Sequence, residues 1–190
     1  WALKMFSEKE KIDFGRLARG SDARYQLQVT NIYKETVHIA SVRTTCGCSA
    51  ATPSKSTLAS RETAIVEITM DTRKFQRQKD SNVIVTFDAP LFAEVRIPIT
   101  AYIRTDVVLT PGAANLGAIE HGKGAEQSLE IAYAGRNDWT IRDVKTNSDH
   151  ITARVEETAR GNGRVSYRLA VAVKPDAPIG VLNQQILLVT

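Results

Sequence analysis

The sequence predicts an all-β protein made of two tandem immunoglobulin-like β-sandwich domains. Two observations support this prediction: apolar and polar residues alternate along many short segments, and the second half of the chain repeats the apolar pattern of the first. A period of two is that of a strand with one buried face, and no segment shows the 3.6-residue period of an amphipathic helix. About seven short strands in roughly 100 residues are typical of an immunoglobulin-like sandwich.

The alternation defines the first expected strands. In "YQLQV" the residues Tyr25, Leu27 and Val29 fall on one face, and the same pattern occurs in "VEITM" (66–70) and "VIVTF" (83–87). We therefore expect three half-buried strands in these segments.

Two further segments carry position-specific signals. "VRIPITAYI" (95–103) also alternates, but Pro98 has no N–H to donate, so we expect this strand to lie at a sheet edge. "RGNGR" (160–164) lies between two alternating stretches. Because Asn and Gly tolerate the positive φ of a tight turn, this segment predicts a β-hairpin.

The chain contains an internal repeat. An offset of 102 residues aligns "DFGRLARG" (13–20) with "NLGAIEHG" (115–122), and after one inserted residue the alignment continues at an offset of 103. This period is too long for a solenoid unit, so it indicates two copies of one domain. We expect domains at residues 1–103 and 104–190, with cysteines in the first alone.

The boundary and the end of the second copy also carry predictions. "ITAYIRTDVVLTP" (99–111) reads as one strand running into the next, without a Gly/Ser linker, which predicts a stiff tandem. The second copy stops at Thr190, which aligns with Phe87. We therefore expect the second domain to lack its last strand, and either a longer natural chain or another element to cover that edge.

Composition and charge narrow the functional classes. Hydrophobic residues make up 43% of the chain and charged residues 24%, as in a globular protein, and no apolar run is long enough to span a membrane. The net charge is +4, with the basic excess in residues 1–103, which falls short of the concentrated basic face of a nucleic-acid binder. The chain begins at Trp1, so we expect it to be processed or truncated and any export signal to be gone.

The triplet "CGC" contains the only two cysteines, Cys46 and Cys48. The Cα atoms of an i, i+2 pair lie near the disulfide range, and Gly47 permits an unusual backbone. A local disulfide staple, or a pair of quiet thiols, is the favoured reading. A redox-active dithiol is the second, but it needs a cation beside an exposed sulfur, and Arg43 is the only one nearby in sequence.

Metal binding is the third reading of the triplet. Two thiolates supply half of a tetrahedral zinc site, but the chain has no second cysteine pair, and His38 is the only histidine in the same domain. We therefore expect no metal and no cofactor.

The segments "FGRLARG", "VRTTCGCSAATP" and "ITMDT" resemble the bacterial domain-of-unknown-function family 1573, which is known by a Cys-Gly-Cys-Thr signature. The resemblance departs at Ser49, where the family usually has Thr, and the second copy has Ser148 and His150 at the cysteine positions. It implies an immunoglobulin-like fold and an extracytoplasmic bacterial protein, and it implies no established activity.

Other segments suggest weaker sites. "RKFQRQKD" (73–80) gathers four cations as a candidate anion-binding loop, although such a run is more often a solvated loop. "GAIEHGKG" (117–124) approaches a phosphate-binding loop, but an inter-strand turn explains it better. Trp139 is read as a core residue that could instead contact a partner. The cations of the candidate loop are Arg73, Lys74, Arg77 and Lys79.

No catalytic residues are predicted, since the chain has no G-x-S-x-G elbow and few histidines. The sequence favours a non-enzymatic extracytoplasmic binding, spacer or structural module of a bacterial envelope or secreted protein. Its expected partner is another protein or an envelope component, not nucleic acid. The alternative is a thiol–disulfide redox or metal-handling protein that uses Cys46 and Cys48.

Overall fold

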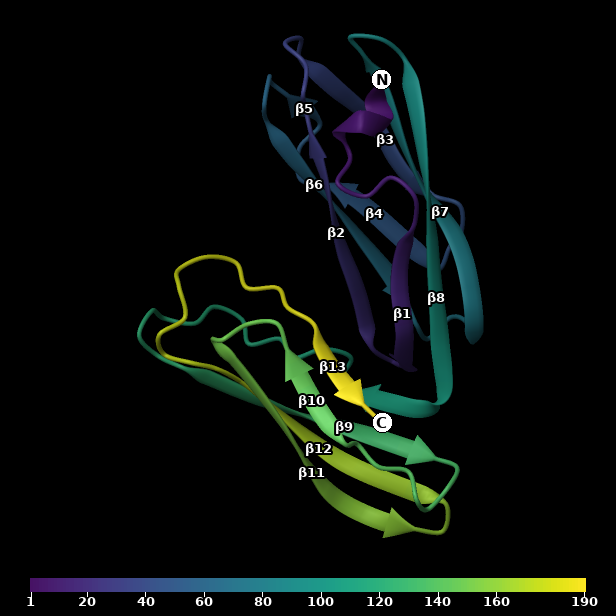
Figure 1. Ribbon diagram of the computed structural model, residues 1–190, viewed down its shortest axis with the longest axis vertical. Helices are drawn as coiled ribbons and strands as arrows, with labels where there is room; N and C mark the ends of the chain where they lie inside the picture. The colour runs from purple at the N-terminus through teal and green to yellow at the C-terminus, as the bar shows by residue number, and fades with distance from the viewer. The chain divides into compact units, whose positions relative to one another are not determined.

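The computed structural model describes residues 1–190, which form thirteen strands and one short 3₁₀ helix, η1 (Ala2–Met5) (Figure 1). The chain divides into two compact units. Unit 1 comprises Trp1–Leu17 and Asp22–Arg104, and unit 2 comprises Ala18–Ser21 and Thr105–Thr190. The predicted all-β fold is confirmed, and no helix of the structure could cross a membrane.

Unit 1 contains a three-stranded antiparallel sheet in the order β2-β6-β4. Its strands are β2 (Asp22–Thr30), β6 (Thr63–Asp71) and β4 (Ser49–Pro53). Every second residue of β6 is buried, and in β2 the same alternation buries Ala23, Leu27 and Val29 and leaves Tyr25 half-buried.

The second sheet of unit 1 is built on β3, β7 and β8, with the short β5 at one side. Strand β1 pairs with β8, and β8 continues past the end of unit 1, where its last four residues pair with β9. The strands are β1 (Ile12–Arg19), β3 (Val37–Thr44), β5 (Thr57–Leu58), β7 (Arg77–Ala89) and β8 (Ala93–Thr110).

The expected edge position of the proline-containing strand is wrong. Pro98 lies within β8 opposite Asn82 of β7, and β8 also pairs with β1 and β9. Proline removes a single donor from the ladder, and the residues on either side, Ile97 and Ile99, keep their register opposite Val83 and Ser81. The strand therefore tolerates Pro98 within its pairing with β7.

The core of unit 1 lies between its two sheets, which makes the unit a sandwich. Side chains from β2 and β6 meet side chains from β7 and β8 in one continuous apolar cluster. The largest contribution at full burial is the ring of Phe87. Other members with no exposed surface include Leu27, Val29, Val66, Ile68, Val83, Val85, Ile97 and Ile99.

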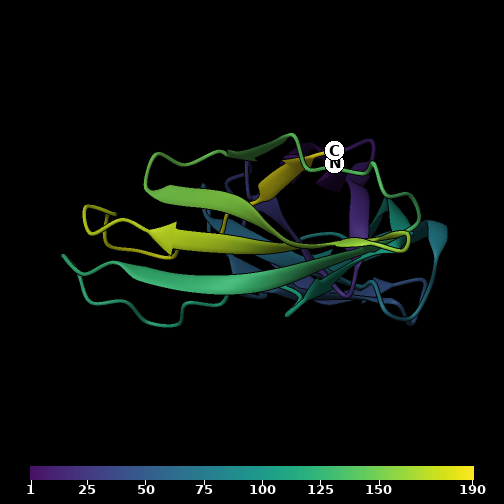
Figure 2. The ribbon, with the colours of Figure 1, turned by 90° about the horizontal axis from the view of Figure 1, so that it is seen from below.

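Unit 2 contains a long antiparallel sheet and a short one. The long strands β9 (Ala125–Ala134), β12 (Arg164–Val173) and β11 (Ile151–Gly161) run side by side (Figure 2). The short sheet pairs β10 (Asp143–Thr146) with β13 (Ile186–Val189). A separate apolar cluster lies in this unit.

The predicted β-hairpin is confirmed. Gly161 faces Arg164 at the end of the β11–β12 ladder, and Asn162 and Gly163 form the turn with φ values of 51° and 71°. Two consecutive positive φ values match the twist of the flanking strands, which explains why Asn and Gly occupy these positions.

The strand pairs of the two units share their register. Leu27 lies opposite Val66 in unit 1, and the residues aligned with them by the sequence offsets, Leu129 and Leu169, lie opposite each other in unit 2. Three further facing pairs of unit 1 correspond in the same way to facing pairs of unit 2. Ser49–Met70 corresponds to Ile151–Val173, Val42–Val85 to Val144–Leu188, and Thr44–Val83 to Thr146–Ile186.

Candidate functional site

The CGC triplet lies in the loop between β3 and β4. Cys46 and Cys48 form a disulfide, with their Cα atoms 5.2 Å apart, and the chain has no free cysteine. Cys48 is buried, with 8% of its surface exposed, while Cys46 is half-buried and Gly47 is exposed. Of the alternatives that the sequence left open, the bridge is the one that the structure contains.

Hydrogen bonds from neighbouring strands fix this loop. The hydroxyl of Thr44 lies 2.7 Å from the carbonyl oxygen of Ser49 and 3.1 Å from that of Cys46. The carbonyl of Cys48 accepts the backbone N–H of Asp71 at 2.8 Å. The loop carbonyls are therefore satisfied within the fold, which favours a single loop conformation.

Unit 2 contains the equivalent loop without cysteines. The hydroxyl of Thr146, which aligns with Thr44, lies 3.3 Å from the carbonyl oxygens of both Ser148 and Ile151. His150 stands at the position of the second cysteine and lies 3.4 Å from Asp176. A threonine at the end of the strand thus holds the following loop in both units.

The cation that contacts the CGC loop differs from the one that the sequence indicates. Arg43 is directed to Glu94, with 3.4 Å between its Nη2 and the carboxylate. Lys74 instead donates from Nζ to the carbonyl of Gly47 at 3.4 Å, and it lies 3.8 Å from the carboxylate of Asp71. Lys74 is therefore the cation beside the disulfide.

The sequence did not indicate the contact between Lys74 and the CGC loop, because Lys74 and Gly47 are 27 residues apart. Ser49 of β4 faces Met70 of β6, so the residues before Ser49 meet the residues after Met70. Only the strand pairing brings the loop at 72–76 to the triplet. A prediction that β4 pairs with β6 would have placed Lys74 beside the CGC loop.

The structure gives no support for the metal reading of the triplet. His38 lies at the start of β3, and its Nδ1 is 2.6 Å from the carboxylate of Asp88. The chain contains no group of three or more His, Cys, Asp or Glu side chains that could hold a metal ion.

The four cations of the predicted anion-binding loop differ in their pairing. Lys74 contacts the carbonyl of Gly47 and the carboxylate of Asp71, and Arg73 pairs with Asp22 at 3.4 Å. Arg77 and Lys79 belong to no ion pair. Two of the four positive charges therefore remain uncompensated by the fold.

The segment that approaches a phosphate-binding loop lies between β8 and β9, with no helix after it. Its lysine, Lys123, pairs with Glu120 at 2.5 Å on the surface. A phosphate-binding loop needs a helix N-terminus behind it, so this segment is an inter-strand connection.

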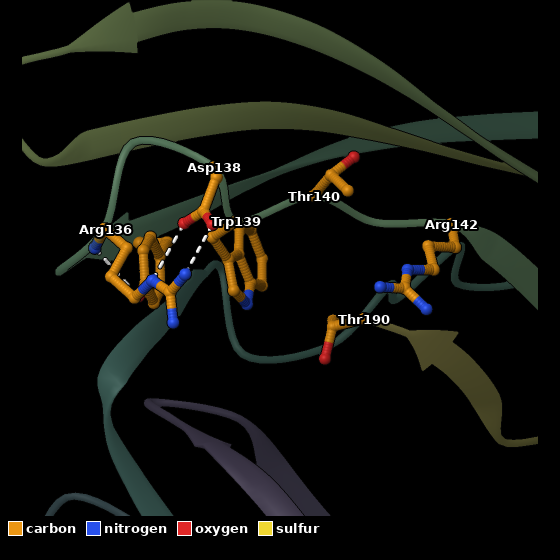
Figure 3. A pocket seen from close by; sticks show the side chains of 7 residues that line it. Arg136, Asp138, Trp139, Thr140, Arg142 and Thr190 are labelled. Atoms are coloured by element: carbon orange, nitrogen blue, oxygen red, sulfur yellow. Dashed lines mark hydrogen bonds and ion pairs between the residues drawn. The ribbon is translucent and has the colours of Figure 1, made fainter.

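Unit 2 contains a cavity of about 240 Å³ beside Trp139 (Figure 3). The sequence identified Trp139 as a core residue or a partner contact. The structure shows it half-buried, packed on the apolar cluster of unit 2 and lining the cavity. The other lining residues are Tyr133, Arg136, Asp138, Thr140, Arg142 and Thr190.

Aromatic contacts hold Trp139 in place. Its ring stacks on Tyr133 with centroids 4.4 Å apart and planes at 9°, and it meets Tyr167 edge to face at 5.9 Å. The indole Nε1 is buried and has no hydrogen-bond partner. A buried N–H without an acceptor is rare and destabilising, so this one marks an unusual position.

In Figure 3, the charged side chains of Arg136 and Asp138 lie on one side of the indole, and Arg142 and the neutral side chain of Thr190 lie on the other. Arg136 holds Asp138 through two bonds, Nε to Oδ1 at 2.9 Å and Nη2 to Oδ2 at 2.5 Å. The hydrogen bond from Arg136 lowers the pKa of Asp138, which keeps this carboxylate ionised. No partner binds the guanidinium of Arg142, whose backbone N–H donates to Val189.

The sequence did not indicate Arg136, Asp138 or Arg142. They lie in the irregular segment between β9 and β10, which has no periodicity to place its side chains. The exposed charge and the aromatic ring come together because this segment folds back over Tyr133 and Tyr167.

Comparison with solved structures finds distant likenesses. A protein of unknown function from Porphyromonas gingivalis W83 is 17% identical over 90% of this chain and 82% of its own, with a TM-score of 0.40. The E. coli chaperone DraB is 12% identical over 97% of this chain and 96% of its own, with a TM-score of 0.43. The Vibrio cholerae protease VesB is 16% identical over 48% of this chain, which spans only 30% of the protease, with a TM-score of 0.38.

These likenesses are too distant to carry an argument about function, and no curated protein matches the sequence. A family comparison is more specific. Residues 5–103 match the family described as "Protein of unknown function (DUF1573)". The match covers just over half of the 190 residues, including the CGC loop and both sheets of unit 1. The chain therefore belongs to the DUF1573 family.

Proposed function

We propose that the protein is a non-enzymatic, extracytoplasmic binding or spacer module of a bacterial envelope or secreted protein. The observation that carries this proposal is the closed CGC loop. Its sulfurs are bonded to each other, Cys48 is buried, and Thr44 and Asp71 hold the loop carbonyls. A disulfide of this kind serves as a local staple, and disulfides persist in oxidising compartments.

We also infer that the two units are copies of one domain. The shared register of four strand pairs and the shared threonine contact at Thr44 and Thr146 support this inference. Two copies of one fold, of which only one contains the cysteines, are expected when the fold serves as a scaffold and binding differs between copies.

Unit 1 offers one surface for such binding. Arg77 and Lys79 keep unpaired charges, and Lys79 lies over the ring of Phe75 at 5.9 Å from its centroid. Lys74, from the same basic segment, contacts the CGC loop at the carbonyl of Gly47. We propose that this surface binds an acidic protein or an anionic envelope component.

Removing two unpaired charges should weaken polyanion binding. In the variant Arg77→Ser/Lys79→Ser, retention on immobilised dextran sulfate should fall, so that the protein elutes at a clearly lower salt concentration than wild type. The matched control is Lys9→Ser/Lys34→Ser, which removes the same charge from exposed positions elsewhere in unit 1. Elution of both variants at the same salt concentration would show that net charge, and not this surface, determines retention.

One observation favours the alternative function in thiol–disulfide chemistry. Lys74 places an ammonium group beside the triplet, and a neighbouring cation is what lowers the pKa of a reactive thiol. The proposed staple role predicts that neither thiol reacts fast after reduction, since Cys48 is buried and Cys46 is half-buried.

Alkylation distinguishes the two roles. The native protein should take up no label, and after reduction it should alkylate slowly at neutral pH, at the same rate in wild type and in Lys74→Met. Intact-mass spectrometry over a time course measures both rates. Fast labelling of one thiol, slowed by Lys74→Met, would overturn the staple role and support the redox function.

A further inference from the structure

Exposed apolar side chains gather at one end of unit 1. The turn between β7 and β8 carries Leu91 and Phe92, with 67% and 73% of their surfaces exposed. Ile32 in the β2–β3 connection and Leu3 in η1 are also exposed. Figure 1 shows η1 and the β7–β8 turn at the same end of the unit. We call the surface defined by these four side chains the apolar end of unit 1. Such a gathering marks an interaction surface.

Direct contacts join the segments that form the apolar end. The ring of Trp1 lies 5.8 Å from that of Tyr33, in the β2–β3 connection, and 5.7 Å from that of Phe87, near the end of β7. The hydroxyl of Tyr33 donates to the carbonyl of Trp1 at 2.8 Å. In the β5–β6 connection, the N–H of Arg61 donates to the carbonyl of Asn31 at 2.8 Å. The four segments therefore form one continuous surface.

Cations without a counterion lie at the same end. Lys4 in η1 and Arg61 belong to no ion pair, and the adjacent Lys34 and Glu35 balance each other. The other acidic side chains of this end all have partners, so the apolar end keeps a net positive charge that fits an anionic partner. These pairs are Lys55 with Glu62, His38 with Asp88, and both Arg43 and Arg96 with Glu94.

The form of the apolar end favours a lipid surface over a protein. A stable protein–protein interface buries about 800 Å² on each partner, which is far more than two adjacent side chains at a hairpin tip supply. Insertion into lipid needs only that the tip, with Leu91 and Phe92, enters the boundary between headgroups and acyl chains. Apolar side chains at that depth, with cations at the level of anionic headgroups, are typical of proteins that lie on a membrane surface.

We propose that the apolar end of unit 1 docks on an anionic lipid bilayer, with Leu91 and Phe92 inserted and Lys4 and Arg61 at the headgroups. The proposal goes beyond the module role, since it assigns a partner to a surface that the basic surface does not include. Arg77–Ala89 forms β7, so about 40 Å of strand separates the basic surface from the apolar end.

Sedimentation with lipid vesicles tests the proposal. The protein should bind vesicles of phosphatidylcholine and phosphatidylglycerol, and it should bind pure phosphatidylcholine at least about 10-fold more weakly, because the cations then have no anionic headgroup to contact. Brominated lipid should also quench Trp1 fluorescence in a Trp139→Phe background, since Trp1 packs on Phe87 at this end.

Removal of the inserted side chains should have the largest effect on binding. Leu91→Ser/Phe92→Ser should lower the partition coefficient on anionic vesicles by about 10- to 100-fold, because two large apolar groups no longer leave water. The matched control is Ile179→Ser/Val181→Ser, which removes two exposed apolar side chains of unit 2 and should bind as wild type does.

Removal of the cations should have a smaller effect. Lys4→Gln/Arg61→Gln should lower the partition coefficient by about 10-fold. The control Lys145→Gln/Arg164→Gln removes the same charge from exposed positions of unit 2 and should change binding less. An equal loss in both variants would show that net charge, and not the apolar end, determines binding.

The vesicle test and the polyanion test fail independently. Leu91→Ser/Phe92→Ser should keep its retention on dextran sulfate, and Arg77→Ser/Lys79→Ser should keep its vesicle binding. Loss of vesicle binding in Arg77→Ser/Lys79→Ser alone would assign the vesicles to the basic surface and overturn the present proposal.

Two further outcomes would overturn the proposal. They are the absence of binding to anionic vesicles and equal partition of Leu91→Ser/Phe92→Ser and wild type. If the protein ignores vesicles but self-associates in sedimentation equilibrium, and Leu91→Ser/Phe92→Ser abolishes that association, the apolar end contacts a second copy of the chain in place of lipid.

Discussion

Phe87→Ala is expected to lower the free energy of unfolding by about 3–5 kcal/mol, because it removes a fully buried ring and leaves a cavity. The ring lies in the core of unit 1, with its centroid 5.7 Å from that of Trp1 and 6.1 Å from that of Phe6. Trp1 fluorescence therefore reports directly on this part of the core. Denaturant titration in a Trp139→Phe background measures the loss without signal from unit 2.

The chain supplies a matched control for this prediction. Phe92 lies in the turn between β7 and β8 with 73% of its surface exposed. Phe92→Ala removes the same atoms, and it should change stability by no more than about 0.5 kcal/mol. If the two variants unfold at the same denaturant concentration, the assignment of Phe87 to the core is wrong.

Asn31→Ala is expected to cost about 2–4 kcal/mol, because it leaves several buried backbone groups without partners. The Asn31 side chain is fully buried after the end of β2. Its amide nitrogen lies 2.8 Å from the carbonyl of Glu35 and 3.0 Å from that of Leu58, and its oxygen accepts the N–H of Tyr33 at 2.9 Å. These bonds connect the β2–β3 connection to β5.

Denaturant titration measures the loss, and hydrogen exchange at the Tyr33 amide locates it. The control is Gln26→Ala, which truncates an exposed amide on the preceding strand, β2, and should stay within about 0.5 kcal/mol of wild type. Retained protection of the Tyr33 amide in Asn31→Ala would show that this hydrogen bond does not hold the connection.

The strands were predictable because their information is local. A buried face at every second residue identifies β2, β6 and β7, and the consecutive Asn162 and Gly163 identify a hairpin turn from their tolerance of positive φ. The same alternation explains why the two units have equivalent strand registers. A slip by one residue would expose Leu27 in unit 1 and Leu129 in unit 2.

The features that the sequence predicted wrongly or did not indicate depend on contacts between residues that are distant in sequence. Pro98 indicates a missing donor, but whether its strand lies at an edge depends on β1 and β9, which no residue of β8 reveals. Lys74 reaches the CGC loop only because β4 pairs with β6. Asn31 carries no periodic signal at all, since its bonds go to carbonyls of a different connection.

The cavity in unit 2 was only partly predictable. Trp139 was visible as a large ring aligned with a core position, whereas Arg142 looked like any surface charge. Both residues line the same cavity because the irregular segment after β9 places them there, with Trp139 stacked on Tyr133. Chemistry in such connections depends on tertiary contacts that a period of two cannot encode.

The threonine contacts at the ends of β3 and β10 do not depend on a disulfide. Thr146 contacts two carbonyls of its loop where no cysteine exists, and Thr44 makes the equivalent pair of contacts in the loop that contains the bridge. We therefore expect the CGC loop to keep its threonine contacts when the bridge is reduced, so that reduction alters the loop locally and leaves the strands on either side in place.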